Sequence, residues 1–247
     1  MLDDSWIDTT DHGNGVVQLR MNCAPVNAMT ARTLRGLQAR LDWLIADDAV
    51  RAIVLSSAFG VFCAGLNLKS ALSLDEEGVH DVIQAMDACY LALYACPKPV
   101  IAAVAGPAIA GGLFLVLASD HRVAGTKAQF GLSEVRVGVG FPMAAKAIAH
   151  ATLSADGLRR LALRGQPVGT EAALKLGMID RIVPGNEVTQ TALRDAEEFA
   201  AMPPRAFAKI KRQLRGDCIR RIEEKLGSRQ RLWFNDETLD AMRRMVG

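Results

Sequence analysis

The sequence lacks the motifs that identify the commonest nucleotide-dependent and hydrolytic enzymes. It has no Walker A motif and no GxSxG motif, which argues against a P-loop nucleotide triphosphatase and an α/β-type serine hydrolase. The stretch GVGFPM begins like a dinucleotide-binding fingerprint, but it has no third glycine and contains Pro142. The four histidines are scattered without HxxxH or HxxE spacing, so no metal centre is expected.

Cysteine is scarce, and its five positions form no metal-binding pattern. The number is odd and most of the positions lie in apolar segments, which indicates reduced, packed thiols. The first residues, MLDDSWIDTTDHG, are acidic and polar rather than basic and then apolar, so no signal peptide is expected. Both features predict a cytoplasmic protein. The cysteines are Cys23, Cys63, Cys89, Cys96 and Cys218.

The charge is nearly balanced over the 247 residues, with a net value of +2, so nucleic acid is not an expected partner. The distribution is uneven, because residues 204–247 hold twelve Lys and Arg against six Asp and Glu. One interpretation is that this basic tail contacts phosphates or an acidic neighbouring subunit. The other is that it is an ordinary solvated helix face.

One apolar stretch, PVIAAVAGPAIAGGLFLVLAS, is long enough to resemble a membrane span. Pro107 and three glycines interrupt its middle, so we expect it to divide into a strand, a loop and a helix in the buried core.

Hydrophobic periodicity predicts an α/β protein in which strands and helices alternate. A helix is expected over NAMTARTLRGLQARLDWLIADD, where Leu34, Leu37, Leu41 and Leu44 recur at helical spacing. The pattern divides the chain into an α/β core, residues 1–185, and a helical C-terminal region, residues 186–247. Strands are expected at 15–21, 51–57, 100–106, 120–125 and 178–184, and helices at 75–96, 111–119, 186–201, 204–215, 218–234 and 236–246.

Two glycine-associated turns are candidate oxyanion sites. The first is FCAGLNL, residues 62–68, and the second is opened by Gly111 and Gly112 before an apolar helix. The first N–H groups of a helix have no internal partner, and the helix dipole favours negative charge there. One N–H from each turn would together hold a carbonyl oxygen that becomes negative. The alternative is that the paired glycines only allow close packing of a helix on a strand.

Glu134 is the candidate general base, because FGLSEVRVGVGFP surrounds one carboxylate with apolar residues and glycine. Burial in such a setting raises the pKa of a carboxyl toward neutrality, where a base works best. The alternatives are an ion pair with Arg136 or a helix cap. Cys63 lies in the first turn but has no His or Lys nearby in sequence, and we interpret it as a packed hydrophobic residue.

The order and spacing of these segments resemble the crotonase (enoyl-CoA hydratase/isomerase) superfamily. The segments that carry the resemblance are RAIVLSSAFGVFCAGLNLKS, CPKPVIAAVAGPAIAGGLFLVLASDHRVAG, AQFGLSEVRVGVGFP and GTEAALKLGMIDRIVP. The resemblance implies a spiral of ββα units with a C-terminal helical region, assembled as a homotrimer or a dimer of trimers. It also implies an acyl-CoA substrate, with coenzyme A as part of the substrate and no separate cofactor.

Specific roles follow from the resemblance. The backbone N–H groups of Leu66 and Gly111 would hold the oxygen of an enolate, and the loop from Ala64 through Gly65 to Leu68, with Gly112, would border the substrate. By charge alone, the CoA phosphates have candidate partners in the tail. These are Lys209, Lys211 and Arg212.

Phe114 departs from the hydratase pattern. Hydratases of the superfamily place one glutamate three residues after the oxyanion glycine and a second where Glu134 lies here; Phe114 occupies the first position. Phenylalanine neither donates nor accepts a hydrogen bond, so the resemblance favours the single-glutamate Δ3,Δ2-enoyl-CoA isomerases. Asn67 replaces the usual aspartate of the first turn. We expect Phe141 and Met143 to line the acyl pocket or pack beneath it.

Two alternatives stay open. One is another crotonase-family reaction, such as hydration, carbon–carbon cleavage or thioester hydrolysis. The other is a non-catalytic relative that binds CoA or RNA through the basic tail; the helix over TARTLRGLQARLDWL offers arginines but no lysine for that purpose.

Overall fold

A computed structural model describes residues 6–228 and 234–246 of the chain. Its main sheet has six strands in the order β1-β2-β3-β4-β6-β9, and every pair is parallel except β1 with β2. Strand β3 reads as a continuous apolar run because helices cover both of its faces. The strands are β1 (Ile7–Asp11), β2 (Val16–Met21), β3 (Ala52–Ser57), β4 (Val100–Val104), β6 (His121–Gly125) and β9 (Arg181–Val183).

A second, three-stranded sheet lies beside the first and has the order β5-β7-β8. Strands β5 and β7 run parallel, with Ile109 opposite Gly131. The carboxyl ends of parallel strands meet at one edge of a sheet, so the residues that follow β5 and β7 lie close together. The strands are β5 (Ala108–Ile109), β7 (Gln129–Gly131) and β8 (Val168–Gly169).

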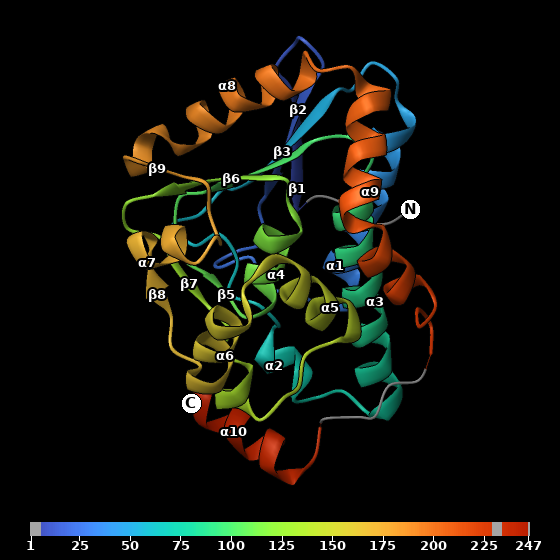
Figure 1. Cartoon of the computed structure of the whole chain (residues 1–247). Coiled ribbons are helices and arrows are strands. Elements are labelled where there is room, and N and C mark those ends of the chain that lie inside the picture. Colours follow the sequence, from blue (N-terminus) through green and yellow to red (C-terminus); the bar gives the residue numbers. More distant parts are fainter. Residues whose placement is uncertain (1–5, 229–233, 247) are drawn as a thin grey trace.

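Helix α4 is the centre of the core, and all of its residues are buried. It is apolar on every side because other elements surround it (Figure 1). The apolar stretch that resembled a membrane span is therefore β4 and α4, as expected. No helix of the part of the chain described here is long and apolar enough to cross a membrane. The helices before residue 185 are α1 (Ala31–Ala46), α2 (Leu68–Ala71), α3 (Glu76–Ala95), α4 (Gly111–Ala118), α5 (Met143–Thr152), α6 (Ala155–Arg164) and α7 (Thr170–Lys175), with a 3-10 turn η1 (Glu134–Val137).

The C-terminal region is helical, as predicted, but one of its boundaries is wrong. Helices were expected at 204–215 and 218–234, whereas a single helix passes through Gly216 without a break. Glycine inside a helix costs about 1 kcal/mol relative to alanine, and the burial of Ile219 and Ile222 against the core outweighs that cost. Residues 229–233 lie outside the described residues, and the division at residue 185 stays a prediction. The elements are η2 (Gly185–Glu187), α8 (Val188–Ala200), α9 (Pro204–Glu223) and α10 (Asp236–Val246).

Helix α8 covers one face of the main sheet, and α9 runs alongside α3 (Figure 1). Small side chains of α8, Ala192 and Ala196, pack with Val54 and Ile101 in a cluster separate from the main core. The main core lies on the other face, between the sheet and α1, α3, α4 and α5.

Candidate active site

The pairing of β5 with β7 brings together two of the predicted site residues. Gly111 follows β5 after one residue, and Glu134 follows β7 after two. The backbone N–H of Ala110 donates to the Gly131 carbonyl at 2.7 Å, which ties the two segments beyond the ends of the strands. One short sheet therefore positions both the second glycine turn and the carboxylate.

The first glycine turn contacts the second at Gly65. Its φ of +88° lies in the left-handed region that favours glycine, and a Cβ added there would lie 3.2 Å from the Gly111 nitrogen. Two bonds to Met29 brace the turn: its N–H donates to the Gly65 carbonyl at 2.8 Å, and its carbonyl accepts from Asn67 N–H at 2.8 Å. Because both bonds use the residues on either side of Leu66, the Leu66 N–H is directed away from Met29.

The N–H groups of Leu66 and Gly111 donate to no acceptor among residues 6–228 and 234–246. Buried backbone N–H groups are nearly always paired, and Gly111 is buried. Two unpaired donors from adjoining turns suit a ligand oxygen, which is the arrangement expected from the sequence.

Ala110, which sequence reasoning missed, gives the second turn its shape. It has φ +50° and ψ −126°, an unfavourable conformation for a residue with a Cβ, and it caps α4 without a side-chain hydrogen bond. Strained residues of this kind persist only where their surroundings determine them. Here Ala110 N–H is held by Gly131, and its carbonyl accepts from Leu113 N–H at 2.9 Å.

Asn27, also missed, holds the first turn from behind. Its side chain is buried, donates to the Phe62 carbonyl at 3.0 Å and to Ser57 Oγ at 2.8 Å, and accepts from Cys23 N–H at 2.8 Å. The predicted thiol Cys63 is fully buried beside it, and burial raises the pKa of that thiol to about 12. Cys63 is therefore a packed residue, as interpreted.

Glu134 is buried, with 6% of its surface exposed, and its Oε2 has no hydrogen-bond partner among the described residues. Burial raises its pKa from 4.5 to about 7, and its own backbone N–H offsets only part of this effect. Arg136 is exposed and forms no ion pair with Glu134. The carboxyl thus has the environment of a base that works near neutral pH.

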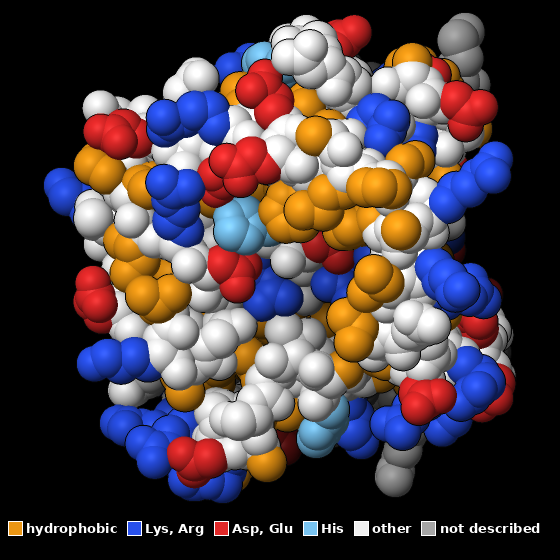
Figure 2. All heavy atoms as spheres, turned by 45° about the horizontal axis from the view of Figure 1, so that its top comes forward, with side chains coloured by type: hydrophobic (Ala, Val, Ile, Leu, Met, Phe, Trp, Pro, Cys, Tyr) orange, Lys and Arg blue, Asp and Glu red, His pale blue; other side chains and the backbone are white. Residues whose placement is uncertain are grey.

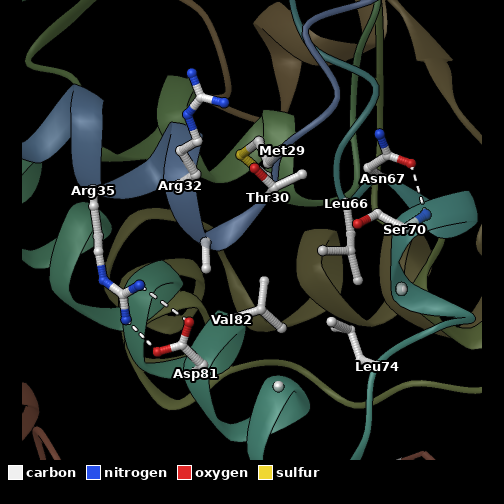
Figure 3. Close-up of a pocket in the computed structure, with 13 residues that line it drawn as sticks. Met29, Thr30, Arg32, Arg35, Leu66, Asn67, Ser70, Leu74, Asp81 and Val82 are labelled. Atoms are coloured by element: carbon white, nitrogen blue, oxygen red, sulfur yellow. Dashed lines mark hydrogen bonds and ion pairs between the residues drawn. The ribbon is translucent and has the colours of Figure 1, made fainter. Parts of the chain in front are cut away.

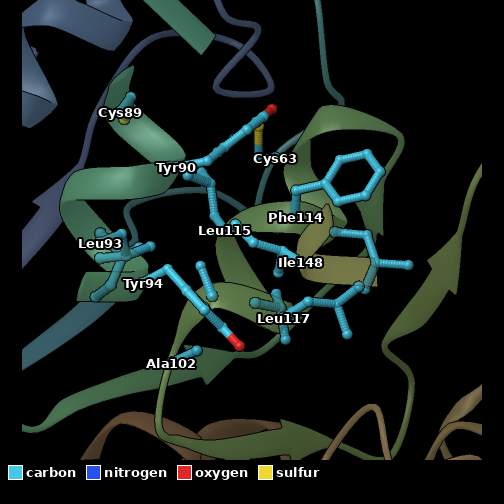
Figure 4. Packing of buried hydrophobic residues seen from close by; sticks show 14 of the residues in the cluster. Cys63, Cys89, Tyr90, Leu93, Tyr94, Ala102, Phe114, Leu115, Leu117 and Ile148 are labelled. Atoms are coloured by element: carbon cyan, nitrogen blue, oxygen red, sulfur yellow. The ribbon is translucent and has the colours of Figure 1, made fainter. Parts of the chain in front are cut away.

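Three aromatic side chains pack together in the core behind the second glycine turn. Phe114 is fully buried, and its ring centroid lies 5.7 Å from that of Tyr90 (Figure 4). The centroid of the Phe141 ring lies 5.6 Å from that of Phe114. Burial is the main cause that raises the pKa of Tyr90 well above its ordinary value, and the charge of Glu134 adds a smaller contribution. The Phe114 ring offers neither a hydrogen-bond donor nor an acceptor to a water molecule.

A pocket of about 370 Å³ opens beside Leu66, between the starts of α1 and α3 (Figure 3). Its apolar wall contains Met29, Leu66, Leu74 and Val82. Arg35 and Asp81 close one side as an ion pair. Of the predicted site residues, Leu66 lines this pocket, and so does its neighbour Asn67.

The family model described as enoyl-CoA hydratase/isomerase matches residues 11–243. The chain belongs to this family. It is 32% identical over 199 residues to the probable enoyl-CoA hydratase EchA17 of Mycobacterium tuberculosis, covering 80% of this chain and 76% of that protein. The enoyl-CoA hydratase EchA3 of Mycobacterium ulcerans has a similar structure, with a TM-score of 0.83, 27% identity, and coverage of 98% of this chain and 100% of that one.

Human mitochondrial Δ3-Δ2-enoyl-CoA isomerase shares the fold, with a TM-score of 0.89 at 23% identity, covering 98% of this chain and 96% of the isomerase. The resemblance to the crotonase superfamily and the predicted fold class are both confirmed. The similar structures include both a hydratase and an isomerase, so membership of the family is compatible with either reaction.

The remaining predicted residues of this family member lie around the two turns. Ala64 is exposed and Leu68, half-buried, begins α2. Asn67 caps that helix, since its Oδ1 accepts from Ser70 N–H at 3.1 Å; the substitution for aspartate keeps the turn braced. Gly112 packs so closely on Cys63 that a Cβ would collide with the Cys63 carbonyl. The close-packing interpretation of the paired glycines is therefore also correct, for Gly112.

The prediction that Lys211 is a candidate to bind the CoA phosphates is wrong. It is buried and its Nζ lies 2.6 Å from Asp120 Oδ2, and Arg215 lies 3.0 Å from the other oxygen of the same carboxylate. These three charged residues line a groove between α8 and α9 whose other lining side chains are hydrophobic. Figure 2 shows a hollow edged with hydrophobic side chains on this face of the molecule. The ion pair of Lys211 with Asp120 therefore links α9 to the core. Lys209 and Arg212 are exposed.

Proposed function

We propose that the protein shifts a double bond in an enoyl-CoA, from the 3,4 to the 2,3 position, with Glu134 as its single base. The observation that supports this most is the buried Glu134 carboxyl, with a pKa of about 7 and an Oε2 that has no partner among the described residues. A carboxyl that is ionised and protonated to similar extents near neutral pH both accepts and returns a proton readily.

The reaction then has two proton transfers. Glu134 removes a proton from C2, and the electron pair moves through the thioester to give a dienolate whose oxygen accepts from Leu66 and Gly111 N–H. The protonated Glu134 then gives the same proton to C4, and the electrons return to form the C2–C3 double bond. Nothing is gained or lost overall, so no cofactor is required.

Phe114 favours this reaction over hydration. Adding water to a double bond requires a group that orients the water, and the family's hydratases use a second glutamate where Phe114 lies. The fully buried ring offers no acceptor or donor and excludes water from the intermediate. Hydration remains the second candidate, because the similar Mycobacterium proteins carry that name.

Substrate binding is part of the same proposal. The loop from Ala64 to Leu68 and the pocket that Leu66 lines receive the acyl-CoA. The resemblance assigns Gly112 and Phe141 to the border of the acyl group. Lys209 and Arg212 remain candidates for the phosphates by charge. The non-catalytic alternative, a relative that binds CoA or RNA, does not explain why Glu134 is buried with an Oε2 that has no partner among the described residues.

The test compares 3-hexenoyl-CoA and 2-hexenoyl-CoA as substrates, following conjugation of the first and water addition to the second. We expect fast conjugation and little hydration, and a loss of about 10²- to 10⁴-fold in kcat for Glu134→Gln. Glu198→Gln, an exposed glutamate on α8, is the matched control. Full isomerase activity in Glu134→Gln, or hydration as the faster reaction of the wild type, contradicts the proposal.

We also propose that the chain assembles as a homotrimer or a dimer of trimers in the cytoplasm, as the resemblance implies. Light scattering of the purified protein should give three or six times the 26.6 kDa of one chain. A monomeric mass contradicts this part without affecting the chemistry.

A further inference from the structure

We propose that Tyr90 is a positioning residue for the oxyanion hole, and that its hydroxyl acts through the Gly111 carbonyl. The proposal rests on the proposed function, because it assigns a role to a residue behind one of the two N–H donors. Tyr90 lies on α3, far from Gly111 in the sequence, and it is fully buried.

The contact is direct. Tyr90 Oη donates to the Gly111 carbonyl oxygen at 3.0 Å. A Cβ built on Gly111 would lie 2.8 Å from the same hydroxyl oxygen, so the hydroxyl covers the α-carbon as well as the carbonyl. Figure 4 shows the Tyr90 hydroxyl directed away from that of Tyr94.

The second turn needs such a restraint. Gly111 and Gly112 are adjacent, and glycine has the widest conformational freedom of any residue. The helix they open has no side-chain cap, and the preceding Ala110 is strained. The donor N–H of Gly111 shares a peptide plane with the Ala110 carbonyl, which Leu113 N–H holds.

The next peptide plane carries the Gly111 carbonyl, and the two planes join at the Gly111 α-carbon. Holding both carbonyls fixes the dihedral angles at Gly111, and with them the direction of its N–H. Tyr90 supplies the hold on the second plane from outside the helix. The Gly111 carbonyl also belongs to the hydrogen-bond ladder of α4, so loss of the hydroxyl loosens this peptide without releasing it. The donor N–H then spends less time aimed at the thioester oxygen, and enolate stabilisation falls.

A purely structural role makes a different prediction. If the hydroxyl only satisfied a buried carbonyl, its removal would lower stability but would affect substrate and enolate equally. A positioning role affects the enolate alone, since the N–H is worth most where negative charge develops.

The experiment uses Tyr90→Phe, which keeps the ring and its contact with Phe114, and Tyr94→Phe as the control one helical turn further along α3. Two ligands separate the roles: acetoacetyl-CoA, which binds as an enolate that absorbs in the near ultraviolet, and saturated butanoyl-CoA. We expect Tyr90→Phe to lose about tenfold in affinity for the enolate and in kcat. Butanoyl-CoA affinity and KM should stay within about twofold, and Tyr94→Phe should match the wild type.

Equal changes for the two ligands, or none, would overturn the role of Tyr90 while leaving the proposed function intact. A wild type that binds the enolate no better than butanoyl-CoA would overturn the proposed function as well. The ratio of the two affinities reports only folded protein, so it decides the matter even where Tyr90→Phe has a lower unfolding midpoint.

Discussion

Glu134→Gln should stabilise the protein at alkaline pH while it abolishes activity. Burial raises the pKa of the Glu134 carboxyl to about 7 in the folded protein, against an ordinary value of 4.5. Below pH 4.5 the group is protonated in both states and costs nothing. Between pH 4.5 and about 7 the unfolded chain ionises while the folded chain keeps its proton, so stability falls across this interval and the loss is complete above pH 7.

The size of this loss follows from the two pKa values. A tenfold change in proton affinity is worth about 1.4 kcal/mol, so the buried carboxylate lowers the free energy of unfolding by about 3 kcal/mol above pH 7. Glutamine has nearly the same shape and no charge, so Glu134→Gln should recover most of this. Chains of this length gain roughly 2–4 °C in Tm per kcal/mol, which gives a rise of about 6–12 °C.

The assay is unfolding of both proteins at pH 4.5 and pH 8.5, at one protein concentration, with Glu198→Gln as the exposed control. The difference between Glu134→Gln and the wild type should be small at pH 4.5 and about 3 kcal/mol at pH 8.5. A difference that does not change with pH would show that burial does not raise the pKa of Glu134, and the argument for it as the base would be wrong.

Three further outcomes are expected. The kcat of the proposed isomerisation should rise with pH through about 7, as Glu134 ionises, and a profile that is flat from pH 5 to 9 would contradict this. Gly65→Ala should lower kcat at least about tenfold, because a side chain at φ +88° costs about 1–2 kcal/mol and pushes on the neighbouring turn; unchanged kinetics would show that the turn adapts. Asp120→Asn should lower the free energy of unfolding in urea by about 3–5 kcal/mol, since it leaves Lys211 buried without its partner. Asp217→Asn, which breaks an exposed ion pair, should change it by less than about 1 kcal/mol, and equal losses would refute the distinction.

The long helices α1 and α3 were predictable because their patterns repeat, whereas the ten-residue helices α5 and α6 were not predicted. Leu34, Leu37, Leu41 and Leu44 are all buried along α1, as their spacing indicated. Strand β1 was not predicted, because IDTTD is mostly polar; its pairing with β2 at the edge of the sheet, and not its composition, makes it a strand. The strands β5, β7 and β8 have two or three residues each, too few for any periodicity, and exist because distant segments pair.

The same limit applies to the site. Glu134 was found because its surroundings in sequence are also its surroundings in space, both apolar. Asn27 and Tyr90 act on backbone groups far away in sequence, and neither has a local pattern that announces it. Lys211 failed as a candidate because charge alone does not distinguish a buried cation from a solvated one.

The tight contact of the two glycine turns restricts how this protein can diverge. Gly65 and Gly112 admit no side chain without displacing neighbouring atoms, so we expect descendants of this sequence to keep both glycines. Phe114 lies on α4, which is buried on every side, and exchange of its ring leaves both glycine turns in place. If the two turns hold an enolate oxygen as proposed, single substitutions at Phe114 change the reaction while enolate formation is kept.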